Sequence, residues 1–261
     1  MHWNHVIVLL SAATVGGVLN ALAGGGSFIT FPTLLFIQVP PVDANATNTV
    51  AMWTGLVASG SAYMHKLDAS RRLLIALVAS SIVGGLVGGL LLLKTPQRTF
   101  LHLVPWLLLG GTLLFIFGNR LRRVGRGHAN GGGGLDHTWS ALALASSFEF
   151  MVGVYGGYFG AGIGFMNLGM LSLLGMREVH AMNALRTLLA VTINVAAVAT
   201  FIVAGVVWWR YCVVMIVGAL LGGWFGARFA QRADPRKIRY FIITLGLSMS
   251  LYFFITVYAK S

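Results

Sequence analysis

The sequence predicts an all-α integral membrane protein with two inverted repeats of about five helical segments each. Three observations favour this fold class. The 261 residues are 57% hydrophobic and only 9% charged, whereas soluble domains carry roughly 25% charged residues. Apolar runs long enough to enter a bilayer recur along the chain. Two glycine-rich breaks, at residues 23–27 and 160–164, lie about half a chain length apart inside such runs.

The predicted helices follow one another in an order that repeats. The first repeat, residues 1–118, contains apolar segments at 6–22, 27–38, 46–64, 73–93 and 101–118. The second repeat, residues 139–261, contains segments at 139–159, 165–175, 182–205, 208–227 and 238–258. Between them, the Arg- and Gly-rich stretch 119–138 indicates a flexible cytoplasmic linker. Both halves therefore have the order long, short, long, long, long.

The two halves also resemble each other weakly in residue identity. Offsets of 137 and 138 residues align glycines of the two breaks, for example Gly25 with Gly162 and Gly26 with Gly164. Corresponding interruptions in two halves of a membrane chain point to a substrate site between internal repeats. A chance likeness of two glycine-rich helices is the alternative, because Gly is frequent in membrane helices.

A short segment follows each break, at 27–38 and at 165–175. At about 18 Å, each is too short to cross ~30 Å of hydrocarbon unaided. Each either continues the preceding helix as a broken crossing or turns back as a re-entrant hairpin. The basic loops at 65–72, 119–127 and 228–239 all belong on the cytoplasmic side by the positive-inside rule. This favours the hairpin, because each half then has an odd number of crossings, the repeats are inverted and both termini face outward.

The charge balance indicates a bilayer rather than nucleic acid as the partner. The net charge of +12 comes from 18 Lys and Arg against 6 Asp and Glu. Basic residues in short loops beside apolar runs normally fix membrane orientation, so we expect no nucleic-acid binding. The single cysteine, Cys212, excludes a disulfide framework and a Cys-based metal site. No His spacing typical of a metal site occurs, so neither a metal nor a cofactor is expected.

The breaks themselves are the first candidate site. Their glycines let a ligand approach the backbone closely, and the helices that follow begin with free N–H groups and a partial positive charge. Two such helix starts, brought together near the membrane midplane, would form an anion site. The alternative is that the glycines only permit close helix packing. The candidate residues at the breaks are Gly24, Gly25, Gly26, Ser27, Gly162 and Gly164.

Polar residues after each short segment form the second candidate group. They recur at helical spacings of three and four, so they could share a face and bind an oxyanion. Arg186 is the sharpest of them, because a buried Arg is rare in membrane segments and its planar fork suits a sulfonate or a carboxylate. Snorkelling of Arg186 to the interface is the alternative, and Asp43 and Asn45 could simply cap a helix. The candidates are Asn45, Asn48, Thr49, Asn183, Arg186 and Thr187.

Glu149 lies near the centre of the apolar segment 139–159. A lone carboxyl group at that depth is costly, so such a residue is a functional candidate by default. It could bind a coupling proton or pair with Arg186, and a purely structural ion pair is an equally acceptable interpretation. The sequence leaves these alternatives open.

Several of these motifs resemble a known family. The runs Gly-Gly-Gly-Ser-Phe-Ile-Thr-Phe-Pro at 24–32 and Val-Asp-Ala-Asn-Ala-Thr-Asn-Thr at 42–49 are similar to the first signature of the TauE/SafE family of sulfite exporters. The stretches 160–164 and 181–187 resemble its second, degenerate copy, with Arg186 near the place of Asn48 or Thr49. The resemblance covers essentially the whole chain. It implies a multi-pass carrier in the bacterial inner membrane for small sulfur-containing or organic anions, such as sulfite, sulfoacetate or other sulfonates.

The function that the sequence favours is a secondary transporter that exports a small anion through a midplane site between the two breaks. The chain has no nucleotide-binding motif, and a negative charge that leaves an inside-negative cell gains about 2.3 kcal/mol per 100 mV. A proton-coupled importer that uses Glu149 is the alternative. An intramembrane enzyme acting through Ser27 has less support because no His lies in a buried segment, and an assembly factor is a third class. The substrate, the direction and the formation of a homo-oligomer stay open.

Overall fold

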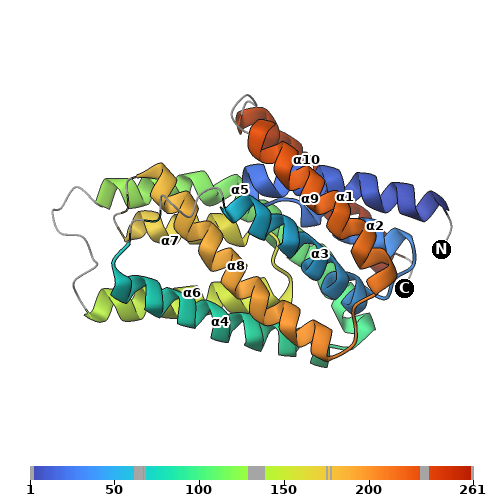
Figure 1. Ribbon diagram of the computed structural model, residues 1–261, viewed down its shortest axis with the longest axis horizontal. Coiled ribbons are helices and arrows are strands. Elements are labelled where there is room, and N and C mark those ends of the chain that lie inside the picture. Colours follow the sequence, from blue (N-terminus) through green and yellow to red (C-terminus); the bar gives the residue numbers. More distant parts are fainter. Residues whose placement is uncertain are drawn as a thin grey trace.

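The described part of the chain consists of helices and short connections, with no strand. The computed structural model describes residues 3–61, 67, 69–128, 139–174, 176, 178–229 and 235–259. These residues contain α1 (Trp3–Ala23), α2 (Ser27–Phe36), α3 (Pro41–Ser61), α4 (Arg71–Lys94), α5 (Gln97–His128), α6 (Trp139–Tyr158), α7 (Ile163–Leu173), α8 (Val179–Val203), α9 (Trp209–Phe229) and α10 (Pro235–Tyr258) (Figure 1). The all-α prediction is confirmed. We call α1–α5 the first half and α6–α10 the second half.

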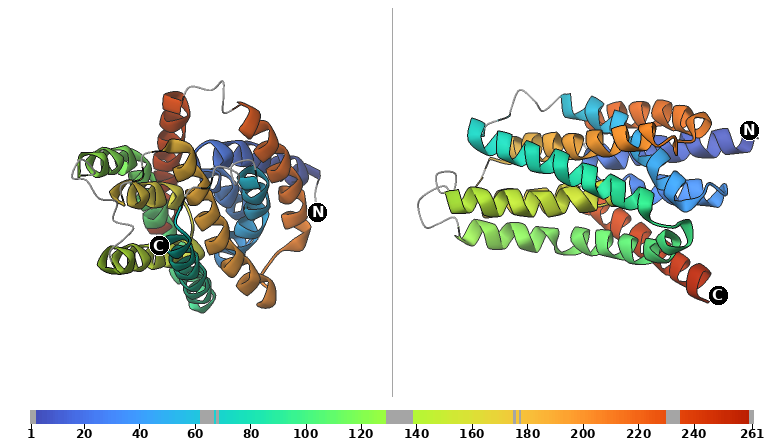
Figure 2. Two further views of the ribbon diagram at one scale, coloured as in Figure 1. Left: turned by 60° about the vertical axis from the view of Figure 1, so that its left-hand side comes forward. Right: turned by 90° about the horizontal axis from the view of Figure 1, so that it is seen from below.

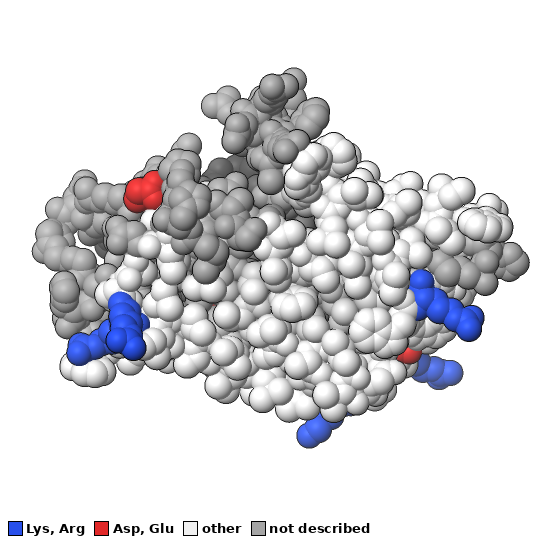
Figure 3. Space-filling model, viewed as in Figure 1, with Lys and Arg blue, Asp and Glu red and all other residues white. Residues whose placement is uncertain are grey.

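Several helices are suited to a bilayer. Five are long and apolar enough to cross it: Trp3–Ala21, Arg71–Lys94, Ala181–Val203, Trp209–Gly226 and Tyr240–Tyr258. Large apolar side chains are exposed along them, for example Ile82 and Leu90 on α4, and exposed apolar surface on this scale marks a membrane face. In Figure 3, the charged side chains that are coloured lie toward the ends and the edge of the molecule, with a broad uncharged middle. The chain is therefore a multi-pass membrane protein.

Two helix boundaries differ from the predicted ones by five residues or more. Helix α5 continues to His128, whereas the sequence predicted an end at 118. Arg and Leu, which are common in this stretch, are good helix formers, and the rest of the predicted linker lies outside the described residues. Helix α3 begins at Pro41 rather than at 46, because Pro is favoured at the first helical position. The capping role considered for Asp43 and Asn45 is therefore wrong, since both lie inside α3.

Glycine-lined contacts join the two halves. A Cβ added to Gly84 of α4 would lie 2.5 Å from the carbonyl oxygen of Phe150 on α6, and one added to Gly222 of α9 would lie 2.0 Å from that of Thr14 on α1. Small residues allow such backbone-to-backbone packing. The fourth helix of each half thus packs against the first helix of the other half. The repeat boundaries and the inversion of the repeats stay predictions.

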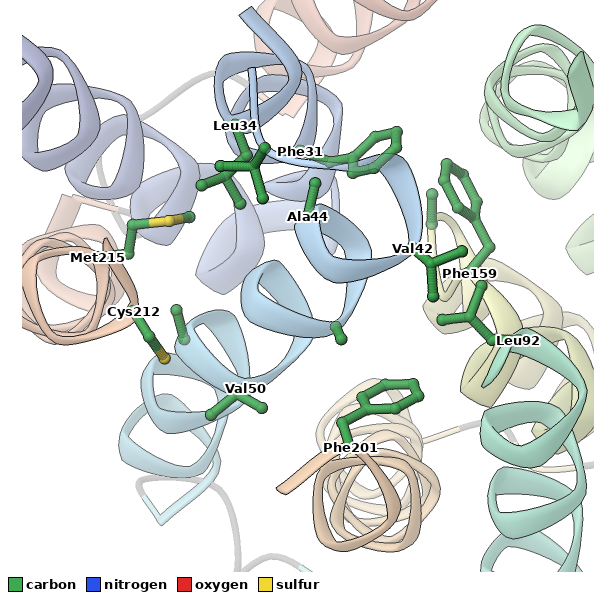
Figure 4. Close-up of a cluster of buried hydrophobic side chains, with 14 of the residues drawn as sticks. Phe31, Leu34, Val42, Ala44, Val50, Leu92, Phe159, Phe201, Cys212 and Met215 are labelled. Carbon is green, nitrogen blue, oxygen red and sulfur yellow. The ribbon is translucent and has the colours of Figure 1, made fainter. Parts of the chain in front are cut away.

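The short helix α2 lies within the main apolar core. Its Phe31 packs edge-to-face on Phe159 with ring centroids 5.6 Å apart, and on Phe100 at 6.2 Å. Figure 4 shows Phe31 and Leu34 of α2 beside Ala44 of α3, in the cluster that also contains Phe159. This packing fixes α2 between helices of both halves, so the break that precedes it is held in place.

The two termini lie away from the connection between the two halves. The start of α1 and the end of α10 lie at the same end of the molecule, and the end of α5 and the start of α6 lie at the opposite end (Figures 1 and 2). Which of these ends faces the cytoplasm stays a prediction.

Candidate functional site

The chain turns sharply at both glycine breaks. Gly24 has a φ of +76°, and Gly160 and Gly162 have φ values of +82° and +85°. This left-handed region is open to Gly at little cost. After the first break, α2 packs back on α1, since a Cβ added to Gly26 would lie 2.3 Å from the carbonyl oxygen of Gly16. Gly26 itself has an ordinary helical φ of −60°, so close packing explains this glycine.

Both breaks border one cavity of about 60 Å³. At ~15 Å³ per water, such a volume holds roughly four water molecules, so it suits a solute of a few heavy atoms. We call it the central pocket. Its lining from the first half is Asn20, Gly24, Ser27, Thr49, Met52, Trp53 and Leu56. Its lining from the second half is Phe159, Gly160, Ile163, Gly164, Arg186, Thr187, Ala190 and Asn194.

The central pocket brings together half of the anion-site candidates that the sequence suggested. Those in its lining are Gly24, Ser27, Thr49, Gly164, Arg186 and Thr187. The other candidates lie outside the lining: Gly25, Gly26, Asn45, Asn48, Gly162 and Asn183. Their part in substrate binding stays a prediction, as does the depth of the pocket in the bilayer.

Asn48 connects α2 to α3 behind the pocket wall. Its Oδ1 accepts a hydrogen bond from Thr30 Oγ1, and its Nδ2 donates to Ser27 Oγ at 3.2 Å. Asn48 and Thr30 are almost completely buried. Ser27 therefore accepts from Asn48, and among the described residues no acceptor takes the proton of its hydroxyl group. That proton is available to a solute in the pocket.

Asn45 connects α3 to the second half. Its Nδ2 donates to the carbonyl oxygen of Tyr158 at 3.0 Å, just before the second break, and its Oδ1 has no hydrogen-bond partner among the described residues. One turn on, Thr49 Oγ1 donates to the carbonyl oxygen of Asn45 at 2.8 Å. Thr187 Oγ1 donates in the same way to Asn183 at 2.7 Å. Both threonines thus give their protons to the backbone, which leaves other groups to donate to an anion.

Arg186 brings positive charge to the pocket. Its side chain is half-buried and lies over the start of α7, where a Cβ added to Gly164 would be only 3.3 Å from Nη1. Turn bonds occupy the N–H groups of Phe28 at α2 and of Phe165 at α7. The guanidinium group carries a full positive charge, so it is the strongest donor in the lining. Among the residues that line the pocket, Arg186 is the one charged side chain. This arrangement favours an anion.

Glu149 lies outside the lining of the pocket. It is completely buried on α6, and its Oε1 accepts a hydrogen bond from Ser81 Oγ of α4 at 2.5 Å. Its Oε2 has no hydrogen-bond partner among the described residues. The hydrogen-bond partner that the structure shows for Glu149 is thus a hydroxyl group on α4, and the coupling proton and the pairing with Arg186 stay predictions.

Some lining residues were missed by the sequence analysis. Leu56 lies seven residues after Thr49, and Asn194 lies seven after Thr187, so extending the predicted helical faces by two turns would have found them. Trp53 Nε1 donates to the carbonyl oxygen of Val191 at 3.3 Å and joins α3 to α8 beside the pocket. No spacing rule singles out this contact.

Comparison with known proteins adds an independent observation. The model of a family described as "Sulfite exporter TauE/SafE" matches residues 9–253. A "Probable membrane transporter protein" of Haemophilus influenzae is 28% identical over 244 residues, which cover 93% of this chain and 92% of the relative. The "Probable membrane transporter protein ORF9" of a Sinorhizobium species is 27% identical, with 93% and 90% covered. The "Probable membrane transporter protein YfcA" of Escherichia coli is 28% identical, with 93% and 87% covered. No solved structure matches the chain.

Proposed function

The chain belongs to the sulfite exporter TauE/SafE family, and from this premise we propose that it is a secondary transporter of a small sulfur-containing or organic anion. Its relatives, of which the match covers 87–92%, are named as probable membrane transporter proteins, so the membrane transporter is the firm part of the assignment. The anion and the place where it binds belong to our proposal.

One observation carries the anion assignment: a single cavity that both glycine breaks, the Ser27 hydroxyl and the Arg186 guanidinium line together. A small space with one positive group and one free hydroxyl proton suits one negatively charged headgroup. A guanidinium group can hold two oxygens of such a headgroup at once. Sulfite and the sulfonates have oxygens arranged in this way.

The rest of the lining supports an anion with a short carbon part. Met52, Trp53 and Leu56 form an apolar wall on α3, and Ile163 and Ala190 extend it in the second half. Apolar groups gain free energy when they leave water, so this wall would stabilise the carbon atoms of a small sulfonate. A short alkanesulfonate therefore uses more of the lining than sulfite does.

The direction follows from the charge of the solute if no other ion moves with it. A monovalent anion that leaves an inside-negative cell gains about 2.3 kcal/mol per 100 mV, which supports export across a bacterial inner membrane. A proton-coupled importer is the second candidate, and the buried Glu149 is the observation that favours it. An intramembrane enzyme has less support, because the amide of Asn48 rather than a base contacts Ser27.

A transport assay with purified protein in liposomes tests the proposal. Efflux of methanesulfonate, sulfoacetate and sulfite is measured for the wild type and for Arg186→Gln. A lost hydrogen bond to a charged group costs about 1.5–3 kcal/mol, so we expect at least a tenfold loss of kcat/KM. Arg98→Gln, which removes a charge from an exposed site, is the matched control. Wild-type transport by Arg186→Gln, or no flux of any of these anions through the wild type, would reject the proposal.

A further inference from the structure

A carboxyl group is buried at the contact between α6 and α4, outside the lining of the central pocket. Glu149 has no exposed surface, and the described residues give it one hydrogen bond, from Ser81. Its Oε2 has no partner among them. A buried carboxylate without a cation is strongly disfavoured, so such a group is normally neutral. In this state of the protein, the carboxyl group of Glu149 is best accommodated with a proton bound.

The charged groups near α6 are few. Helices α4, α7 and α8 pack on α6, and the described charged side chains on them are Arg71, Arg72 and Lys94 at the ends of α4, and Arg186 on α8. On α6 itself, Tyr155 donates its hydroxyl proton to the carbonyl oxygen of Ala161 at 2.8 Å, and Tyr158 contacts Thr95. The hydrogen bond that Glu149 receives comes from none of these groups.

Helices α4 and α6 pack closely on one side of Glu149. A Cβ added to Gly84 would lie 2.9 Å from the Cα of Gly153, and one added to Gly88 would lie 2.1 Å from the carbonyl oxygen of Val154. At these positions the backbones of α4 and α6 are in direct contact. A relative movement of α4 and α6, as alternating access involves, would change the surroundings of Glu149 and let its proton exchange.

The corresponding contact in the other half lacks the carboxyl group. Gly84 lies against Phe150 and Val154 as Gly222 lies against Thr14 and Val18, which makes α1 the counterpart of α6 and α9 the counterpart of α4. One residue before Thr14 and three before Gly222, the positions of Glu149 and Ser81 are occupied by Ala13 and Ala219. Both alanines are completely buried. Helix packing of this kind therefore has no need of a carboxyl group.

The surroundings of Glu149 touch the wall of the pocket. Val152, one turn along α6 from Glu149, packs in a small apolar cluster with Ile163 and Ala190. Those two residues line the central pocket. A movement of α7 or α8 that accompanies binding of an anion would therefore reach the helix that carries Glu149.

We propose that Glu149, held by Ser81, is a proton-binding site and that one proton travels with each anion. This inference rests on the proposed function. An O–H bond forms on the Glu149 carboxylate on one side of the membrane and breaks on the other, and no group is oxidised or reduced. With a monovalent anion the cycle moves no net charge, and the direction of net flux is set by the anion and pH gradients together.

The test uses full-length protein in liposomes with a trapped pH dye, with the membrane potential held at zero by valinomycin and equal potassium. Methanesulfonate is the probe, because it stays ionised and cannot carry the proton itself. When it flows out of wild-type vesicles, the interior becomes alkaline. In Glu149→Gln, we expect this pH change to fall at least tenfold, while exchange of labelled for unlabelled methanesulfonate continues within about twofold. Ser147→Ala, an exposed position on the same helix, is the control and keeps both activities.

Each outcome decides the question. Wild-type efflux without a pH change, or an undiminished pH change in Glu149→Gln, would overturn the proton site. So would a folded Glu149→Gln that no longer exchanges the anion, because Glu149 would then belong to anion binding. An absence of anion flux through the wild type would instead reject the proposed function, and the coupling with it.

Discussion

Alanine substitutions at three glycines separate the two physical reasons for a glycine, which are space and backbone conformation. At Gly24 an added Cβ meets nothing within 4 Å, but φ is +76°. At Gly26, φ is an ordinary −60°, but the Cβ would lie 2.3 Å from the carbonyl oxygen of Gly16. Gly110, inside α5, has neither constraint. Alanine at each position therefore tests one cause at a time.

The expected free energies of unfolding differ in sign and in size. Gly110→Ala should stabilise the protein by about 0.5–1 kcal/mol, since Ala is favoured over Gly inside a helix. Gly24→Ala should cost about 1–2 kcal/mol, because a Cβ in the left-handed region contacts the backbone. Gly26→Ala should cost about 3 kcal/mol, the upper part of the range for overpacking, because the nearest atom is a backbone oxygen of α1 that cannot rotate away.

Thermal unfolding of the purified protein in detergent measures these differences. One kcal/mol shifts Tm by about 2–4 °C for a chain of this size. We expect Gly110→Ala to unfold slightly above the wild type, Gly24→Ala a few degrees below it, and Gly26→Ala lowest, by roughly 6–12 °C. If Gly26→Ala unfolded at or above the temperature of Gly24→Ala, the inferred packing of α2 on α1 would be incorrect.

Two further substitutions probe the pocket and its support. Gly164→Ser places a side chain within 3.3 Å of Arg186 Nη1, so the guanidinium group must shift. A hydrogen bond from a charged group to the anion is worth about 1.5–3 kcal/mol. We therefore expect KM for methanesulfonate to rise at least tenfold, with Tm unchanged. An unchanged KM would contradict this. Asn48→Leu removes the hydrogen bonds to Thr30 and Ser27. It should lower the free energy of unfolding by about 1–3 kcal/mol. An unaltered thermal unfolding curve would show that the two bonds contribute nothing.

The apolar pattern predicted the helices well because lipid requires nearly every residue of a spanning segment to be apolar. Its largest errors were at two helix ends, because hydropathy cannot recognise that the Arg-rich stretch continues α5 to His128, or that Pro41 begins α3. The glycine contacts of Gly84 and Gly222 were missed, since glycines inside an apolar run look alike until their neighbours are known. The repeat of these glycines at an offset of 138 was the available signal.

The candidate site was predicted in part for a similar reason. Helical spacing indicated a polar face on α3, and Thr49 does line the pocket. Spacing could not tell that Asn45 and Asn48 are used for contacts with α6 and α2, because that depends on which helix lies beside each position. Trp53 was missed because a tryptophan in a membrane segment is also typical of simple packing.

The exchange of fourth helices between the halves has a consequence for biosynthesis. Thr14 on α1 packs against Gly222 on α9. The face of α1 that contacts α9 therefore has no partner helix until most of the chain has been synthesised. Contacts between such distant residues form slowly. A nascent chain stopped after α5 would expose this surface to lipid or to quality-control proteases, and the two halves, expressed as separate polypeptides, should each depend on the other to accumulate.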